Sequence, residues 1–320
     1  VALLFLAHPV HSEVVANIKG RDELLALLLS LMTTWLAIRY IEEKRVSMLP
    51  MISLGIFFAL LAKENAMAFV LLIPGVVYLF FKNYKKAILP LSVALLAGGL
   101  IFLLLRFKVL GYLSGGELPA ELLNNPFLES SLSQKFGTIF FTLGDYLRLL
   151  IFPLTLTHDY YPYHVQLVEM TSFLPLMSFI VYLGMVVAIG ALLKKQPAVV
   201  FALLLYLVPL FIVSNLLFSV GTFMNERFIY FSSLGFILLV IYIIWYKIPV
   251  GKSAQVRFDK GTVLFVLTVL VLFSARTILR NQVWQSNFTL FTSDVSVSKK
   301  SVKCNVAAGG EWMAFADKQS

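Results

Sequence analysis

Three motifs interrupt the apolar sequence with charged side chains, and each places a cation beside a carboxylate. They are residues 8–23 with His8, His11, Glu13, Arg21 and Asp22, residues 63–65 with Lys63 and Glu64, and residues 225–227 with Glu226 and Arg227. Guanidinium and ammonium groups bind anions such as phosphate, and carboxylates can orient cations or accept protons. Because charges at membrane depth are costly, those that occur there usually mark a working site.

The composition identifies the kind of element that must position these motifs. Of the 320 residues, 59% are hydrophobic and only 13% are charged, and the mean hydropathy is +0.87. Membrane-spanning helices need that much apolar surface, whereas a soluble domain does not. The net charge of +9 comes from Lys and Arg spread over short loops, which excludes a basic nucleic-acid surface.

Apolar runs long enough to cross a membrane, or nearly so, predict an all-α polytopic protein with about eight spans in this chain. The runs are 24–41, 47–62, 66–81, 87–105, 173–193, 197–218, 228–246 and 261–279. Basic clusters fall on alternate loops, which the positive-inside rule assigns to the cytoplasm. The clusters are Arg39/Lys44/Arg45, Lys82/Lys85/Lys86, Lys194/Lys195 and Lys247/Lys252/Arg257/Lys260. All three charged motifs are then predicted to lie on the opposite side, which faces a lumen or periplasm.

The segment 106–172 starts and ends on that outer side, so it is predicted to contain no crossing. Apolar residues at helical spacing predict a helix that lies in the interface with its apolar face down. That face consists of Phe136, Ile139, Phe140, Leu143, Leu147 and Leu150, and the residues largely off it are Thr138, Thr142, Asp145 and Arg148. A hairpin of two crossings is the alternative, and it would place Asp145 and Arg148 in mid-span.

Smaller features complete the reading. Asn124-Asn125-Pro126 predicts a turn. Residues 158–164 form an aromatic loop in which Asp159 is followed by three tyrosines, which are typical of an interfacial belt, the alternative being a platform that stacks on a sugar. One cysteine, Cys304, excludes an intrachain disulfide, and no metal-ligand spacing is present.

After residue 280 the sequence turns polar, and residues 301–318 predict a helix that could begin a repeat. The chain starts without Met inside an apolar stretch, so we expect it to be a fragment.

Several strings together resemble a known family. Residues 8–25 (HPVHSEVVANIKGRDELL) are similar to the "HPxHxEAVAxxxGRxDLL" signature of the transmembrane and tetratricopeptide-repeat-containing O-mannosyltransferases. Residues 61–64 (LAKE), 124–126 (NNP), 157–160 (THDY), 220–235 (VGTFMNERFIYFSSLG) and 281–284 (NQVW) resemble further elements of that family in its order. Ser232 stands where the family usually has proline.

The resemblance implies a membrane glycosyltransferase of the GT-C type that takes a sugar from a polyprenyl-phosphate donor. In that family the donor is dolichyl-phosphate mannose, the acceptor is a protein Ser or Thr, and the repeats project into the lumen. Transfer from such a donor requires no metal or cofactor beyond the lipid-linked sugar itself. The resemblance also implies that the main acidic residues of the reaction centre lie in a loop upstream of Val1. The location would be the endoplasmic reticulum in a eukaryote and the inner or plasma membrane in a bacterium.

On that reading, Arg21, Lys63 and Arg227 bind the donor phosphate, and Asp22, Glu64 and Glu226 orient them or take part in catalysis. Further candidates are His8, His11, Glu13, Tyr230 and Asp159. Each also has a structural interpretation: Asp22 can interact with a helix dipole, Lys63-Glu64 can be a wet ion pair, and the histidines can be capping residues.

Two other functions stay open at this point. The same donor machinery could transfer the sugar to a lipid-linked or surface glycan. Alternatively, the protein could be a transporter or flippase, a class that typically shows inverted internal repeats with broken helices.

The sequence predicts two parts: a membrane module over residues 1–280, with the outer segment 106–172, and a tail over 281–320 that leads into repeats. Membrane lipid and acceptor proteins are the expected partners, and nucleic acid is not.

Overall fold

A computed structural model describes residues 1–82, 84–111, 125–246 and 260–318. The described residues form helices joined by loops, with no strand among them. The α-helices are α1 (Ala2–Ala7), α2 (Ser12–Ala16), α3 (Arg21–Glu43), α4 (Leu49–Ala62), α5 (Ala68–Phe80), α6 (Tyr84–Leu110), α7 (Leu132–Ile151), α8 (Phe173–Leu192), α9 (Pro197–Val213), α10 (Tyr230–Tyr246), α11 (Lys260–Val283), α12 (Asn287–Val297) and α13 (Val302–Asp317). Short 3-10 helices include η2 (Ile18–Gly20), η4 (Glu64–Met67) and η5 (Glu226–Ile229).

The predicted spans are confirmed as helices. Within the described ranges, five helical segments are long and apolar enough to cross a membrane, and they include α3, α6, α8, α10 and α11. Three shorter apolar helical segments contain α4, α5 and α9. Each of the eight apolar runs therefore forms a helical segment for most of its length. The protein is an all-α polytopic membrane protein.

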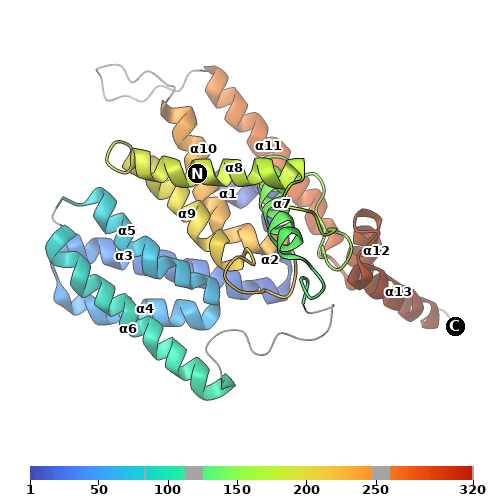
Figure 1. Ribbon diagram of the computed structural model, residues 1–320, viewed down its shortest axis with the longest axis horizontal. Helices are drawn as coiled ribbons and strands as arrows, with labels where there is room; N and C mark the ends of the chain where they lie inside the picture. The colour runs from blue at the N-terminus through green and yellow to red at the C-terminus, as the bar shows by residue number, and fades with distance from the viewer. Residues whose placement is uncertain (83, 112–124, 247–259, 319–320) are drawn as a thin grey trace.

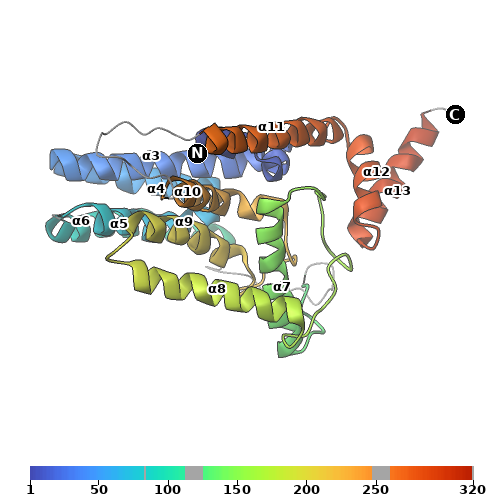
Figure 2. The ribbon, with the colours of Figure 1, turned by 90° about the horizontal axis from the view of Figure 1, so that it is seen from above.

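The spans lie roughly alongside one another, and the remaining helices gather at one end of them (Figures 1 and 2). In Figure 2, α7 runs across the direction of the spans, while α12 and α13 project beyond the same end. The loops that join α3 to α4 and α8 to α9 lie at the opposite end. This division agrees with the alternation of basic and motif-bearing loops in the sequence.

Two clusters of buried apolar side chains hold the molecule together. The first joins α3, α4, α5, α6, α9 and α10 through residues such as Ile56, Phe69 and Phe231. The second joins α7 and the loop after it to α9 and η5, with Tyr146 and Ile229 among its members. Helix α9 contributes to both clusters, so the crossing helix α7 is fixed to the spans through it.

Gly20 shapes the start of α3 because it allows a close backbone contact. A Cβ at Gly20 would lie 2.2 Å from the carbonyl oxygen of Val14, so only glycine fits without a shift. Asn17 supports the same turn, since its Oδ1 accepts a hydrogen bond from the Lys19 amide at 3.0 Å. The turn leads directly into Arg21 and Asp22 at the first positions of α3. Glycine at position 20 of the first motif is therefore required by the backbone packing, in addition to any chemical role of the charged residues that follow it.

Helix α7 confirms the predicted helix, but its buried face is wider than the predicted stripe. Ser131 and Gln134 form a capping box at its start. Thr138 and Thr142, which the pattern placed off the stripe, are buried, whereas Phe136 is 42% exposed. The reason is that the helix is covered on two sides: the Thr138 hydroxyl accepts a hydrogen bond from the Val168 amide of the following loop at 3.0 Å.

The predicted turn and the predicted C-terminal helix are also present. The Leu128 amide donates to the Asn125 carbonyl oxygen at 3.3 Å, which places a turn after Asn125, while Asn124 lies outside the described residues. Helix α13 covers Val302–Asp317, within the predicted range 301–318. It packs against α12 as a helical pair, and its membership of a longer repeat stays a prediction, as do the domain boundaries.

The contact between α9 and α10 generates a prediction about stability. A Cβ at Gly235 would lie 2.3 Å from the backbone nitrogen of Tyr206, so Gly235→Ala forces the two helices apart. We expect a loss of about 1–3 kcal/mol, the usual range for overpacking, seen as a lower Tm in detergent. Gly184→Ala on α8 is the control, because nothing lies within 4 Å of its Cβ position. Equal Tm values for the two variants would contradict the close packing.

Candidate functional site

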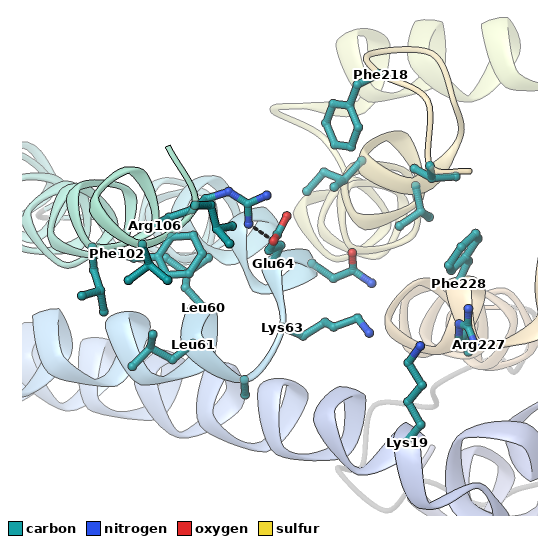
Figure 3. A pocket seen from close by; sticks show the side chains of 18 residues that line it. Lys19, Leu60, Leu61, Lys63, Glu64, Phe102, Arg106, Phe218, Arg227 and Phe228 are labelled. Atoms are coloured by element: carbon teal, nitrogen blue, oxygen red, sulfur yellow. Dashed lines mark hydrogen bonds and ion pairs between the residues drawn. The ribbon is translucent and has the colours of Figure 1, made fainter. Parts of the chain in front are cut away.

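A cavity of about 660 Å³ lies where the second and third motifs approach the end of the spans (Figure 3). Its walls come from η2, the end of α4, η4, the end of α6, the end of α9 and η5. Most of the lining is apolar, and the lining includes Leu60, Leu61, Phe102, Leu105, Ile212, Val213, Phe218 and Phe228. An apolar wall beside charged groups suits a ligand that is part lipid and part ion.

Cations dominate the charged part of the lining. Lys19, Lys63, Arg106 and Arg227 all line the cavity, against one carboxylate, Glu64. In Figure 3 the ammonium groups of Lys19 and Lys63 point toward the same part of the cavity as Arg227. Arg106 forms an ion pair with Glu64. The cavity is therefore suited to an anionic group.

Lys63 is held in place by carboxylates from the first motif. Its Nζ lies 2.6 Å from Asp22 Oδ2 and 3.4 Å from Glu23 Oε1. Asn65 supports the same group, because its Nδ2 donates to Glu23 Oε2 at 3.2 Å. Glu23 is fully buried, whereas Asp22 and Lys63 are partly exposed. The structure thus joins the first and second motifs, which are about forty residues apart in sequence.

Arg227 is held in the same way by Glu13. The Glu13 carboxylate accepts from the Arg227 amide at 3.0 Å and from its guanidinium Nη1 at 3.3 Å. Burial raises the pKa of Glu13 to about 7, although the Arg227 charge works against that rise. The first and third motifs are therefore in contact, and Glu13 positions the arginine without itself lining the cavity.

His8 and His11 are buried and make structural hydrogen bonds. Since a carbonyl oxygen only accepts, His8 Nε2 donates to Leu150 at 3.0 Å, while its Nδ1 accepts from the Val10 amide at 3.3 Å. Burial lowers the pKa of His8 to about 4 and that of His11 well below its usual value. Neither ring lines the cavity. His8 caps the short 3-10 helix that contains His11.

Three more predicted site residues lie outside the cavity lining. Arg21 is exposed at the start of α3. The Tyr230 ring is buried and packs edge-on against His11 at 4.9 Å between ring centroids. Asp159 lies in the loop after α7, and its Oδ2 accepts from the Ser301 hydroxyl at 3.0 Å. Their roles at a site stay predictions.

Glu226 is adjacent to Arg227 in sequence, yet its side chain serves the loop after α7. Its Oε1 accepts from the Thr157 amide at 2.6 Å and from the Tyr160 hydroxyl at 2.9 Å. The side chain is fully buried, and its Oε2 has no partner among the described residues. This dipeptide therefore connects the cavity, through Arg227, to the outer loop, through Glu226.

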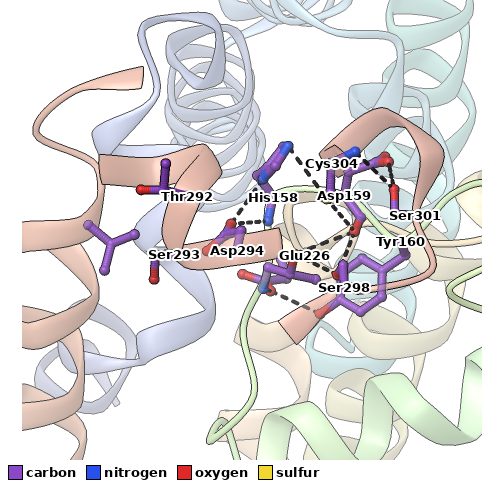
Figure 4. Close-up of polar contacts among 12 residues, drawn as sticks. His158, Asp159, Tyr160, Glu226, Thr292, Ser293, Asp294, Ser298, Ser301 and Cys304 are labelled. Atoms are coloured by element: carbon purple, nitrogen blue, oxygen red, sulfur yellow. Dashed lines mark hydrogen bonds and ion pairs between the residues drawn. The ribbon is translucent and has the colours of Figure 1, made fainter. Parts of the chain in front are cut away.

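A second ionic network fixes that loop to α12 (Figure 4). Asp294 accepts from Arg280 Nη1 at 2.5 Å and Nη2 at 2.9 Å, and from the His158 amide at 2.7 Å. His158 Nδ1 lies 3.0 Å from the same carboxylate, and its Nε2 lies 3.8 Å from Cys304 Sγ. Cys304 is buried. The network joins α11, α12 and α13 to the loop.

These contacts shift two of the pKa values outside the spans. Burial works to lower the pKa of His158, but its hydrogen bond with Asp294, together with Cys304, raises it to about 9. Burial works to raise the pKa of Asp294, but hydrogen bonds from Arg280 and His158 hold it below its usual value. His158 is therefore a cation at neutral pH.

Lys19 and Arg106 are cavity residues that the sequence patterns did not single out. Lys19 precedes the GRD string, and it is exposed and lines the wall. Arg106 is the first charged residue after a long apolar run, and its place in the last turns of α6 is a typical position for a cation. Among the described residues, no group of three or more His, Cys, Asp or Glu is arranged to hold a metal ion.

Comparisons with known proteins find several protein O-mannosyl-transferases among the relatives of this chain. The chain is 26% identical to Protein O-mannosyl-transferase F38B6.6 of Caenorhabditis elegans, over 96% of this chain and 42% of the relative. It is 27% identical to Protein O-mannosyl-transferase TMTC3 of Homo sapiens, over 94% of this chain and 35% of the relative. For TMTC1 of Homo sapiens the values are 29%, 94% and 38%. The chain thus spans less than half the length of these curated relatives.

No protein-family model and no solved structure matches the chain. The likeness to these relatives nevertheless extends over nearly the whole length of the chain.

The network around Asp294 predicts that docking of α12 depends on pH. Because the folded pKa of His158 is about 9 and its usual value is about 6.5, its stabilising effect is complete below pH 6.5 and is lost as the pH rises through 9. The full effect is on the order of 3 kcal/mol. Amide hydrogen exchange of α12 should therefore become faster above pH 9, after correction for the intrinsic rate.

Asp294→Asn should weaken protection of α12 at every pH and reduce this dependence. Glu311→Gln is the control, since Glu311 on α13 forms no ion pair with a described residue. Equal α12 protection in Asp294→Asn and the wild type at pH 6 would contradict the role of the network.

Proposed function

The chain belongs to the transmembrane and tetratricopeptide-repeat-containing protein O-mannosyltransferase family, and from that premise we propose that it forms the membrane part of a protein O-mannosyltransferase. The donor in this proposal is mannose on a polyprenyl phosphate, such as dolichyl-phosphate mannose. The acceptor is a Ser or Thr hydroxyl of a protein on the lumenal or periplasmic side.

The observation that carries the proposal is the cavity with apolar walls and a cationic end. A polyprenyl-phosphate sugar has a long apolar chain, a phosphodiester with one negative charge and a polar sugar. The apolar walls formed by α4, α6 and α9 suit the chain, and Lys19, Lys63, Arg106 and Arg227 suit the phosphate. This combination is the main support for a lipid-phosphate donor.

The cations have a specific role in the transfer step. When the hydroxyl oxygen attacks the anomeric carbon, the bond to the phosphate oxygen breaks and the phosphate gains a second negative charge. Positive groups placed beforehand stabilise that charge more in the transition state than in the ground state. We assign this role first to Arg227 and Lys63, because Glu13 and Asp22 hold them in position.

A base must also take the proton of the acceptor hydroxyl. Among the carboxylates described, Asp22 and Glu64 are partly exposed near the cavity, so they are candidates along with acidic residues expected upstream of Val1. Glu226 is buried and hydrogen-bonded to the outer loop. We therefore propose that Glu226 positions Arg227 and the loop.

Arg227→Ala tests the proposal directly. In the full protein supplied with polyprenyl-phosphate mannose and acceptor peptide, we expect transfer to fall at least about 100-fold, the usual cost of removing one preorganised group that stabilises charge in the transition state. Membrane insertion and expression should not change. Transfer of radiolabelled mannose to the peptide is the measurement.

Arg39→Ala is the matched control. Arg39 also pairs with a carboxylate, Glu43, but it is half exposed at the other end of α3, and an exposed pair of this kind contributes little. Wild-type turnover in Arg227→Ala would remove Arg227 from the site. Transfer to a lipid-linked glycan and not to peptide would favour the alternative acceptor, and movement of the donor across vesicles without transfer would favour a flippase.

A further inference from the structure

A second cavity, of about 640 Å³, lies on the outer side of the molecule. Helix α7 contributes Asp145 and Arg148, the loop after it contributes Tyr160 and His164, and the turn between α12 and α13 contributes Lys299 and Lys300. Unlike the first cavity, it is formed by the segments that extend beyond the spans. None of its residues belongs to the charged motifs of the sequence.

The two cavities are connected through neighbouring residues. Tyr160 lines the second cavity, and its hydroxyl donates to Glu226 at 2.9 Å. Glu226 precedes Arg227, which lines the first cavity. A ligand in the second cavity would thus contact Tyr160, which is hydrogen-bonded to the neighbour of the cation in the proposed donor site.

The second cavity carries a net positive charge that comes from the two lysines. Arg148 neutralises Asp145, because its Nε and Nη2 lie 2.5 and 3.1 Å from the two carboxylate oxygens. His164 adds no charge at neutral pH, since burial lowers its pKa. Lys299 and Lys300 are exposed and form no ion pair with a described residue. Their charges are therefore available to a ligand.

The wall between α7 and the loop is well defined. A Cβ at Gly137 would lie 2.1 Å from the Val168 carbonyl oxygen, so the loop backbone lies directly on the helix. The Thr138 hydroxyl accepts from the Val168 amide at 3.0 Å. On the opposite side, Ser298 donates to the Asp159 carbonyl oxygen at 3.0 Å and fixes the end of α12 to the same loop. The cavity is thus part of the fixed packing between α7, the loop and α12.

We propose that this second cavity binds the acceptor polypeptide, and that Lys299 and Lys300 select segments with acidic residues near the acceptor hydroxyl. The inference rests on the proposed transferase function, and it adds the acceptor class and the residues that recognise it. A peptide fits better than a neutral glycan, because unpaired ammonium groups favour a ligand with carboxylates. The lysines stand at the start of the segment that leads away from the spans, where a protein acceptor can approach.

Charge reversal provides the test. Two fluorescent peptides of equal length contain one central Thr, flanked by Asp residues in one and by Lys residues in the other. Without donor, the full wild-type protein in nanodiscs should bind the acidic peptide about tenfold more tightly. The double variant Lys299→Glu/Lys300→Glu should reverse that order. A misfolded protein would bind neither peptide, so a reversed preference cannot come from loss of folding.

A matched control makes the same change in charge outside the cavity. Lys303→Glu/Lys318→Glu changes the net charge by the same four units at the two ends of α13, and neither residue lines the cavity. This variant should keep the wild-type order of affinities. Equal affinities for the two peptides in the wild type, or the same order in the Lys299→Glu/Lys300→Glu variant, would overturn the inference. Binding of a neutral oligosaccharide in place of both peptides would also overturn it.

Mannose transfer, measured with the same peptides, separates the two hypotheses. If transfer follows the binding order, both hypotheses are supported. If transfer occurs equally to both peptides and in both double variants, the acceptor site is wrong and the transferase function stands. If the binding order is as expected but no peptide or glycan receives mannose, the proposed function fails and only a peptide-binding cavity remains.

Discussion

Charged side chains that lose part of their hydration at the end of a membrane-spanning bundle are stabilised by a partner of opposite charge from a neighbouring segment. In this protein the partners come from distant parts of the chain. Lys63 lies between the carboxylates of Asp22 and Glu23, and Glu13 holds Arg227. These pairs tie the starts of α3, η4 and η5 together. The cation-lined cavity depends on them, because the same contacts that offset the cost of burial also aim the cations.

The dipeptide of Glu226 and Arg227 links this cavity to the outer part of the molecule. Arg227 faces the cavity, while Glu226 is buried under the loop after α7 and receives two hydrogen bonds from it. The same loop is fixed to α12 through His158 and Asp294. Outer segments and spans therefore form a connected set of contacts. This continuity connects the proposed donor cavity, through Arg227, Glu226 and Tyr160, to the proposed acceptor cavity.

The sequence predicted the fold well and the site only in part. Long apolar runs predicted all eight apolar helical segments, five of which are long enough to cross a membrane, because hydropathy over a helix is a local property. The face of α7 was predicted less well: Thr138 is buried by a loop thirty residues away, which periodicity within one helix cannot reveal. Lys63, Glu64 and Arg227 were predicted and line the cavity, whereas Lys19 and Arg106 were not predicted. Both are single cations near span ends, where orientation signals and functional residues have the same local pattern.

The sequence by itself therefore determined the class of protein, the number of apolar helices and the motifs that resemble one family. It did so because these properties depend on composition and on residues close together in the chain. The tertiary structure decided which charges pair, which motif residues face a cavity and which, like His8 and His11, support the packing. The physical reason is that burial and charge pairing are set by segments far apart in sequence. Two neighbours within one motif, such as Glu226 and Arg227, can consequently lie in different environments.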